Sequence, residues 1–272
     1  MASRTRTERI LVFIPAYNCE RQIGRVLAQL QGNEALFSEV IVVDNRSPDN
    51  TVDAAIAAAK NLQLPVRVVR NVDNLGLGGS HKSAFAYAAR AGHDYVVVLH
   101  GDDQGSIADL VPHIQAGEHR GVDCLLGARF MPGSQLENYS AFRTFGNEVF
   151  NLLFSAAAGK RLYDLGSGLN MYRVGAVRDL RYHGFADNLT FNYYMILATV
   201  YRRWKIRFFP ISWREDDQIS NVKLARQSMQ VLQLLATFVF RRRRFLEGSH
   251  THRAADAYRF ETVFDNGVPV QS

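Results

Sequence analysis

The first half of the chain alternates short apolar runs with longer segments of helical periodicity. The runs are rich in β-branched residues and apolar throughout, which is typical of strands buried on both faces of a parallel sheet. Between them, apolar residues recur at spacings of three and four, which places them on one face of a helix. We predict strands at 10–15, 40–44, 66–69, 95–99 and 123–127, and helices at 20–31, 47–60, 79–91 and near 107–116.

The alternation weakens beyond Pro132. We predict helices at 141–158 and 192–204, a loop leading into a strand at 164–172, and a strand at 206–213 that ends at Arg214. Residues 229–240 form an apolar-rich helix of about three turns, four arginines follow at 241–244, and 250–272 is predicted as a polar tail. We therefore divide the chain into a domain of residues 1–225 and a C-terminal region of residues 226–272.

Composition narrows the classes of protein and of partner. With 272 residues, 47% hydrophobic and 21% charged, the chain is neither disordered nor collagen-like, and it can bury a large core. The net charge of +6 favours an anionic partner, which is a nucleotide phosphate, an acidic lipid surface or a nucleic acid. The basic block at 241–244 lacks interleaved aromatic residues, so nucleic-acid binding is the weakest of the three.

Cysteine content and the absence of targeting patterns bear on the compartment. Cys19 and Cys124 are the two cysteines, which excludes a cysteine-type metal site and favours buried thiols in a reducing compartment. The apolar run at 10–14 is too short for the core of a signal peptide. No segment approaches the roughly 20 apolar residues of a membrane span. We therefore expect a cytoplasmic protein, with a peripheral position on the cytoplasmic membrane face as the variant of that prediction.

Ligands of a parallel sheet bind beyond the carboxyl ends of its strands. The most informative segment there is His-Gly-Asp-Asp-Gln at 100–104. Short carboxylates on a tight turn suit a hard divalent cation, which would neutralise a pyrophosphate. The alternative is a solvated acidic turn in which Asp103 or Asp109 caps a helix.

Two further segments follow strand ends. Asp44 ends the second strand, and its carboxylate either accepts the N–H of a nucleobase or serves a turn and helix cap. The glycine-rich loop at 74–80 brings backbone N–H groups close to phosphate oxygens, or it is turn chemistry alone. The dinucleotide fingerprint is missing after the first strand, where the chain has Pro-Ala-Tyr-Asn at 15–18.

In combination these fragments are far more specific. Their order resembles glycosyltransferase family 2, most of all the dolichyl- and polyprenyl-phosphate mannosyl- or glucosyltransferase branch, over roughly residues 9–225. The resemblance implies a GT-A fold, an α/β domain whose mostly parallel sheet is flanked by helices, here with a C-terminal amphipathic helix. The matching fragments are Pro-Ala-Tyr-Asn at 15–18, Val-Asp-Asn-Arg-Ser-Pro-Asp-Asn-Thr at 43–51, Asn-Leu-Gly-Leu-Gly at 74–78, His-Gly-Asp-Asp-Gln at 100–104 and Gly-Ala-Arg at 127–129.

The same resemblance assigns roles to individual residues. It implies that the metal, Mg²⁺ or Mn²⁺, is held by Asp102 and Gln104 with His100, and that Asp102, Arg129 and Arg214 are catalytic. Arg214, with Ser220 and Lys223, matches a loop that closes over the donor and acceptor phosphates, and Asp164, Ser167 and Gly168 match a segment on the acceptor side. The implied nucleotide-sugar contacts are Pro15, Tyr17, Val42, Asp44, Gly101, Asp102, Arg129, Arg214 and Lys223.

The chain departs from the family pattern at several positions. His100 replaces the first Asp of the usual D-x-D motif, and an imidazole is a softer ligand, which leaves the identity of the metal and metal dependence itself open. Arg46 follows Asn45 where Asp-Gly is usual, which adds a possible phosphate contact. The acidic run at 215–217 after Arg214 is expected to face water, with adjustment of the loop as the alternative.

The acceptor follows from what the chain lacks. A sugar hydroxyl needs a positioned general base, and saccharide-extending relatives supply one from a late acidic pair. Here the segment 185–191 contains Asp187 and no acidic pair. A lipid phosphate is already anionic and needs charge compensation, which Arg129, Arg143, Arg214 and Lys223 would supply.

We therefore predict an inverting glycosyltransferase that moves a hexose from a UDP- or GDP-sugar to a polyprenyl (undecaprenyl or dolichyl) phosphate. The alternatives are a glycosyltransferase with a saccharide or other hydroxyl acceptor, and a degenerate, non-catalytic nucleotide-sugar-binding protein. A polyprenyl acceptor requires a membrane surface, which the apolar helix at 229–240 and the arginines at 241–244 would contact. The alternative for that helix is a core or partner-binding role. A small membrane protein is a possible partner, and the aromatic stretch at 191–194 is expected to pack in the core.

Overall fold

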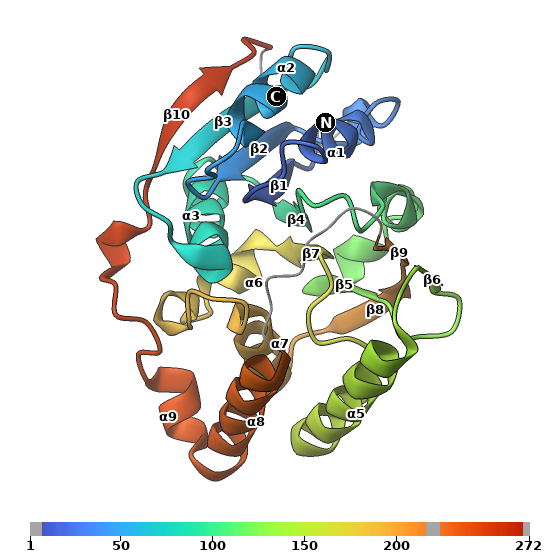
Figure 1. The fold of residues 1–272 in the computed structure, drawn as a ribbon, viewed down its shortest axis with the longest axis vertical. Coiled ribbons are helices and arrows are strands. Elements are labelled where there is room, and N and C mark those ends of the chain that lie inside the picture. The colour runs from blue at the N-terminus through green and yellow to red at the C-terminus, as the bar shows by residue number, and fades with distance from the viewer. Residues whose placement is uncertain (1–6, 216–223, 269–272) are drawn as a thin grey trace, which may run out of the picture.

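The computed structural model describes residues 7–215 and 224–268. Within them, the centre is an eight-stranded sheet in the order β10-β3-β2-β1-β4-β7-β5-β8 (Figure 1). The pairs β1–β2, β2–β3, β1–β4 and β5–β8 are parallel, whereas β7 and β10 pair antiparallel with their neighbours. The strands of this sheet are β1 (Ile10–Ala16), β2 (Glu39–Asp44), β3 (Val66–Asn71), β4 (Tyr95–Leu99), β5 (Cys124–Ala128), β7 (Leu169–Arg173), β8 (Ile206–Pro210) and β10 (Phe260–Asp265).

Helices cover both faces of the sheet. Those on one face are α1 (Ile23–Ala28), α2 (Thr51–Ala59) and α4 (Val111–Gln115). Those on the other are α3 (Gly76–Arg90), α5 (Ala141–Ala158), α6 (Val174–Arg178), α7 (Phe191–Tyr201), α8 (Leu224–Phe240) and α9 (Arg242–Glu247). Figure 1 shows α5, α8 and α9 together at the end of the molecule far from α2. The predicted α/β architecture is confirmed.

The continuous apolar runs of the central strands have a direct physical origin. Successive side chains of a strand point to opposite faces. In β1, Val12 and Ile14 therefore belong to the core beneath α1 and α2, whereas Leu11 and Phe13 belong to the core beneath α3 and α7. Because both faces are buried, no position in such a strand can be polar without cost.

The predicted single strand at 206–213 is wrong, because the chain makes two strands there. β8 ends at Pro210, and β9 (Ser212–Arg214) pairs in parallel with β6 (Gln135–Glu137) in a separate two-stranded sheet. Pro210 has no N–H to donate to a continued ladder, so the strand cannot extend through it. This break carries Trp213 and Arg214 from the main sheet toward the turn after β4, where the backbone N–H of Arg214 donates to the carbonyl of Gln104 over 2.9 Å.

The described part of the C-terminal region packs on the rest of the chain, which corrects the expectation of a polar tail for residues 250–268; residues 269–272 lie outside the described residues. β10 pairs antiparallel with β3, and Tyr258 is buried. Pairing covers the backbone edge that β3 would otherwise expose. In α8, Leu234 and Phe238 are buried in the core, whereas Phe240 is 83% exposed.

The structure bears on the predictions about the cysteines and about membrane-spanning segments. Cys19 and Cys124 are both buried free thiols, as the sequence predicts, and burial raises the pKa of Cys19 to about 12. In the described part of the chain, none of the helices has the length and apolar character to cross a bilayer.

Candidate active site

Two cavities meet at the turn that follows β4. The strand-end cavity has a volume of about 360 Å³ and lies beyond the carboxyl ends of β1 and β4. The helix-side cavity has a volume of about 500 Å³ and is bordered by α5, α7 and α8. Of the residues that the structure describes, four line both cavities: Leu77, His100, Asp102 and Leu189. A molecule in one cavity and a molecule in the other would therefore both reach Asp102.

The turn at 100–104 separates its two carboxylates. Asp103 has a positive φ of 58° and points away from the cavities. Its Oδ2 accepts from Arg25 Nε over 2.7 Å and from Arg214 Nη2 over 2.9 Å. Asp102 alone faces the two cavities. The alternative of a solvated turn is wrong for Asp103, because that side chain is buried in ion pairs.

The three predicted metal ligands, His100, Asp102 and Gln104, all line the helix-side cavity. Burial raises the pKa of Asp102 to about 6. Burial, with the charge of Arg129, lowers the pKa of His100 to about 4, so its imidazole is neutral at pH 7. The Nε2 atom of His100 is buried without a hydrogen-bond partner among the described residues. A neutral nitrogen, a carboxylate and the amide of Gln104 are donor types that bind divalent cations in proteins.

This donor set is small. Across residues 7–215 and 224–268, no group of three or more His, Cys, Asp or Glu side chains is placed to hold a metal. The other ligands of a cation at Asp102 would therefore come from His100, from the amide of Gln104 and from a bound substrate. Glycine at 168 leaves room for the imidazole of His100, because a Cβ at that position would lie 2.9 Å from Cγ of His100.

Among the described residues, four of the predicted nucleotide-sugar contacts line the strand-end cavity. They are Pro15, Tyr17, Gly101 and Asp102, and Tyr17 is half exposed. The N–H of Gly101 donates to the carbonyl of Pro15 over 3.0 Å, and a Cβ on Gly101 would lie 3.0 Å from that same oxygen. Glycine at 101 therefore lets the turn after β4 lie against the end of β1.

Asn45 organises the glycine-rich loop, a role that sequence reasoning missed. The predicted loop at 74–80 is shorter than expected, because α3 already begins at Gly76; we keep the name glycine-rich loop for residues 73–78, which end in the first turn of α3. Its Oδ1 accepts from the backbone N–H of Leu75 over 2.8 Å and from Asn71 Nδ2 over 3.0 Å. Its Nδ2 donates to Asn74 Oδ1 over 2.9 Å. The available signal was the substitution of Asn for the usual Asp at this position, since an amide donates and accepts at once.

The structure places Asp44 and Val42 away from the cavity walls. Asp44 is fully buried and accepts from Arg70 Nε over 3.0 Å and from the N–H of Ser47 over 3.1 Å. Val42 is buried in the core beneath α1 and α2. The neighbour of Asp44, Asn45, lines the cavity that Asp102 also lines. The two segments therefore meet at one cleft, through Asn45 in place of Asp44.

Arg129 and Asp164 form a buried pair in the helix-side cavity. Nε and Nη2 of Arg129 donate to the two carboxylate oxygens of Asp164 over 2.8 and 2.9 Å, and the backbone N–H of Arg129 donates over 2.9 Å. Burial disfavours the charged form of both groups. The attraction and hydrogen bonds between Arg129 and Asp164 outweigh this effect, so the pKa of Arg129 is raised and the pKa of Asp164 is lowered. The guanidinium also lies over the ring of Trp213, 4.9 Å from its centroid.

The other predicted phosphate-binding cations are also engaged or lie outside the described residues. Arg143 Nη1 donates to Glu215 Oε1 over 2.7 Å, and both residues line the helix-side cavity. The expectation that Glu215 faces water is therefore wrong. Arg214 pairs with Asp103 and is not part of either cavity wall. Lys223 and Ser220 fall within 216–223, outside the described residues.

The aromatic stretch at the start of α7 is divided between core and cavity. Phe191 and Tyr194 are buried in the core, as the sequence predicts for the whole stretch. Asn192 and Tyr193 line the helix-side cavity, and Tyr193 also packs against the core. A helix turns by about 100° per residue, so four consecutive positions cannot share one face, and this periodicity was the signal that could have found Tyr193.

Solved structures share this fold. The crystal structure of glucosyl-3-phosphoglycerate synthase from Mycobacterium tuberculosis in complex with UDP is 20% identical, with a TM-score of 0.64 over 85% of this chain and 79% of that chain. The same enzyme with Mn²⁺, UDP and glucosyl-3-phosphoglycerate is 21% identical, with a TM-score of 0.63 over 85% of this chain and 79% of that chain. The predicted GT-A fold is confirmed; the predicted membrane role of the C-terminal helix stays a prediction.

Curated relatives lead to the family. The undecaprenyl-phosphate mannosyltransferase of Micrococcus luteus is 28% identical over 67% of this chain and 76% of its own length. The polyprenol monophosphomannose synthase of Mycolicibacterium smegmatis is 27% identical over 61% of this chain and 62% of its own length. The model of glycosyl transferase family 2 matches residues 11–181. That match covers more than half of the chain, which therefore belongs to this family and is a glycosyltransferase.

Proposed function

We propose that the protein transfers a hexosyl group from a UDP- or GDP-sugar to a polyprenyl phosphate, with inversion at the anomeric carbon. The two cavities support two substrates, the nucleotide in the strand-end cavity and the acceptor phosphate in the helix-side cavity, with the diphosphate at Asp102 between them. The names of the relatives from Micrococcus luteus and Mycolicibacterium smegmatis support the acceptor class and favour mannose.

One observation carries the choice of acceptor. The carboxylates that line the helix-side cavity, in the described part of the chain, are Asp102, Asp164 and Glu215. Asp164 and Glu215 are each held by an arginine, and Asp102 belongs to the proposed metal set. None of them is therefore placed as a general base, which a neutral hydroxyl acceptor needs and an anionic phosphate does not. Asp187, the other candidate, is held by Lys82.

The donor diphosphate requires compensation of its charge. His100, Asp102 and Gln104 would hold Mg²⁺ or Mn²⁺, and the bound cation would neutralise the diphosphate as it leaves. Solved structures of the Mycobacterium tuberculosis enzyme are complexes with Mn²⁺ or Mg²⁺ and UDP, which supports this assignment.

The arginines would position the acceptor phosphate. A guanidinium carries five N–H donors in a planar fork, so a carboxylate partner does not exhaust its capacity. We assign Arg129 and Arg143 to the acceptor phosphate in the helix-side cavity. The assignment of Arg214 and Lys223 to a closing loop remains a prediction, because Arg214 pairs with Asp103 here.

An apolar surface beside the helix-side cavity suits a lipid acceptor. α5 and α8 pack together, and both carry exposed apolar side chains, among them Phe145 at 66% and Leu152 at 70% on α5. The exposed Phe240 and the arginines at 241–244 border a shallow basic hollow. We propose that these faces rest on an acidic lipid surface, where apolar side chains insert and each arginine contributes about 1 kcal/mol.

A transfer assay tests the proposed function. Purified protein is incubated with UDP-glucose, UDP-N-acetylglucosamine or GDP-mannose, with Mn²⁺ or Mg²⁺, and with either undecaprenyl phosphate or undecaprenol. We expect product with undecaprenyl phosphate and no product with undecaprenol. NMR should show that the anomeric configuration of the product is opposite to that of the donor. Transfer to hydroxyl acceptors alone would contradict the proposed acceptor. Binding of a donor without hydrolysis or transfer would favour the non-catalytic nucleotide-sugar-binding protein, and failure to bind any donor would contradict both interpretations.

Localisation and protein partners stay predictions. Action from the cytoplasmic face agrees with the two buried free thiols. Co-purification of the chain with membranes, and its release by high salt, would test a peripheral position. A small membrane-protein partner would appear as a second band that survives this purification.

A further inference from the structure

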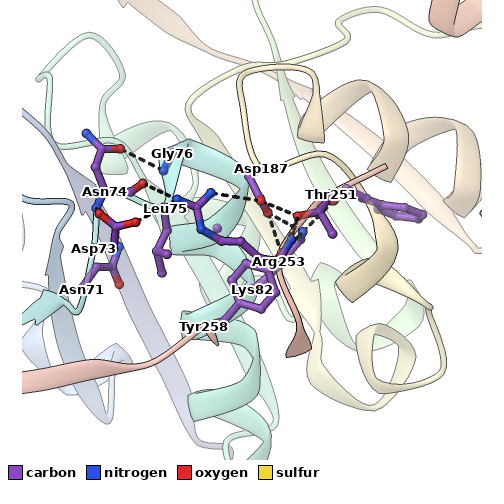
Figure 2. Close-up of polar contacts among 12 residues, drawn as sticks. Asn71, Asp73, Asn74, Leu75, Gly76, Lys82, Asp187, Thr251, Arg253 and Tyr258 are labelled. Atoms are coloured by element: carbon purple, nitrogen blue, oxygen red, sulfur yellow. Dashed lines mark hydrogen bonds and ion pairs between the residues drawn. The ribbon is translucent and has the colours of Figure 1, made fainter. Parts of the chain in front are cut away.

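Part of the C-terminal region returns to the edge of the strand-end cavity. Residues 251–258, which we call the strap, run between α9 and β10 and contact α3 and two loops (Figure 2). At the centre lies Lys82 of α3, whose side chain is fully buried. Its Nζ donates to Asp187 Oδ1 over 2.6 Å and to the hydroxyl of Tyr258 over 2.9 Å. The buried ammonium thus joins the strap to the loop that contains Asp187.

Arg253 of the strap joins that loop to the glycine-rich loop. Its Nη2 donates to Asp73 Oδ2 over 3.0 Å and to the carbonyl of Asn74 over 3.1 Å. Its Nη1 lies 3.5 Å from Asp187 Oδ2, which also accepts from the hydroxyl of Thr251 over 2.5 Å. Figure 2 shows the guanidinium of Arg253 between these partners.

The first turn of α3, at the end of the glycine-rich loop, also lies in direct backbone contact with the loop that contains Asp187. The carbonyl of Asp187 accepts from the N–H of Gly78 over 2.7 Å. A Cβ on Gly76, whose φ is +71°, would lie 2.4 Å from that carbonyl oxygen, and a Cβ on Gly78 would lie 2.4 Å from the carbonyl oxygen of Ala186. The glycines therefore permit a contact that side chains would prevent.

Both loops carry residues of the cavities. Asn74, Gly76 and Leu77 line the strand-end cavity, and Leu189 lines both cavities. Resting on the proposed function, we propose that the strap positions these two loops for the nucleotide-sugar, with Arg253 as the positioning residue that bridges them. Arg253 acts through the loops and has no place in either cavity wall.

Loss of the Arg253 side chain would increase the local disorder of the two loops more than it would lower the free energy of unfolding of the whole protein. Its partner Asp73 is largely exposed, and exposed ion pairs contribute little to global stability. The apparent Kd of a ligand rises in inverse proportion to the population of the binding-competent state. If the ordered loops fall to about one tenth of the population, the Kd of the nucleotide rises about tenfold.

The first experiment needs no ligand. Amide hydrogen exchange is measured over peptides that cover 73–79 and 185–190 in the full-length wild type, in Arg253→Met and in the control Arg259→Met, which changes an exposed arginine near the strap. We expect exchange in both peptides to accelerate at least about threefold in R253M, with a Tm within about 2 °C of the wild type, and no change in R259M. Unchanged hydrogen exchange in R253M would overturn the proposal that the strap orders these loops.

The second experiment is a double-mutant cycle on nucleotide affinity. The Kd of UDP and of GDP with Mn²⁺ is measured for wild type, R253M, Asp73→Asn and the double variant. We expect about a tenfold rise in R253M, a smaller rise in D73N, and a double variant no weaker than R253M, because both changes remove one contact. Effects that multiply would contradict action through the glycine-rich loop.

The two experiments separate the strap from the proposed function. A wild-type protein that binds neither nucleotide would contradict the proposed function, and hydrogen exchange would then still decide whether the strap orders the loops. A wild-type protein that binds a nucleotide, together with an R253M variant of unchanged Kd, would leave the proposed function intact and overturn the positioning role of Arg253.

Discussion

The guanidinium of Arg129 and the carboxylate of Asp164 lie side by side in the helix-side cavity, with their two closest N–O distances at 2.8 and 2.9 Å. Both side chains are largely buried, and Arg129 follows β5 whereas Asp164 precedes β7. The pair therefore joins two segments of the sheet and at the same time forms part of the proposed acceptor site.

Asp164→Ala is expected to destabilise the protein strongly, because it leaves Arg129 buried without its partner. Breaking such a pair costs about 3–5 kcal/mol, which for a domain of this size lowers the Tm by about 10 °C. Differential scanning calorimetry measures the change. The control Glu247→Ala breaks the exposed pair with Arg243 and should leave the Tm within about 1 °C. A D164A variant that melts like the wild type would show that the pair does not support the fold.

Asp102→Asn is expected to abolish the metal-dependent part of nucleotide binding. The neighbouring Asp103→Asn is the matched control, because Asp103 points to Arg25 and Arg214 and away from both cavities. Transferase activity should fall at least about 100-fold in D102N, since an amide cannot supply the charge that a divalent cation requires. The added Tm shift of UDP or GDP with Mn²⁺ should vanish in D102N and persist in D103N. Its persistence in D102N would exclude Asp102 as a ligand.

The carboxyl of Asp187 predicts a dependence of stability on acid pH. Burial alone would raise its pKa, but hydrogen bonds from Lys82, Thr251 and Tyr258 outweigh burial and hold the pKa below the ordinary 3.8. As pH falls below 3.8, the unfolded state takes up the proton first, so the contribution to stability is complete above that pH and is lost below it.

The test compares wild type with Asp187→Asn between pH 5 and pH 3. The variant should melt lower at pH 5, because Lys82 loses its carboxylate partner, and the difference in Tm should narrow as pH falls. Arg253 also faces Asp187 and stays charged between pH 5 and pH 3, so it does not change the direction in which the Tm difference varies with pH. A constant difference in Tm across this range would contradict the lowered pKa.

The apolar face of α5 predicts separate effects on lipid and on soluble activity. The double change Phe145→Ser with Leu152→Ser removes two side chains that are 66% and 70% exposed, so the Tm should change little. Co-sedimentation with vesicles that contain acidic lipid should fall several-fold, and transfer to vesicle-borne undecaprenyl phosphate should fall with it. Donor hydrolysis in the absence of vesicles should be unchanged. Equal vesicle binding by variant and wild type would exclude this face from the lipid contact.

The sequence was sufficient to predict the strands and the loops that follow their carboxyl ends. This was possible because hydrophobic periodicity depends on residues that are close together in the chain. The turn at 100–104 and the segment ending at Asn45 meet at one cavity, as parallel strands require. The same reasoning missed Asn45 itself, the cavity-facing Tyr193 and the strap residue Arg253. The role of Arg253 depends on contacts with residues far along the chain, for which neither spacing nor composition carries a signal. For Asn45 and Tyr193 the sequence does carry a signal, in the Asn that replaces the usual Asp and in the helical period at the start of α7.

The sequence alone determined the α/β class, the order of most elements, the family resemblance and the turn that carries Asp102. Only the tertiary structure decided which carboxylate faces the cavities, which arginine each acidic side chain neutralises, and that residues 260–265 complete the sheet. The physical reason is that periodicity follows from the backbone of a single segment. An ion pair such as Lys82 with Asp187 instead depends on the packing of segments 105 residues apart.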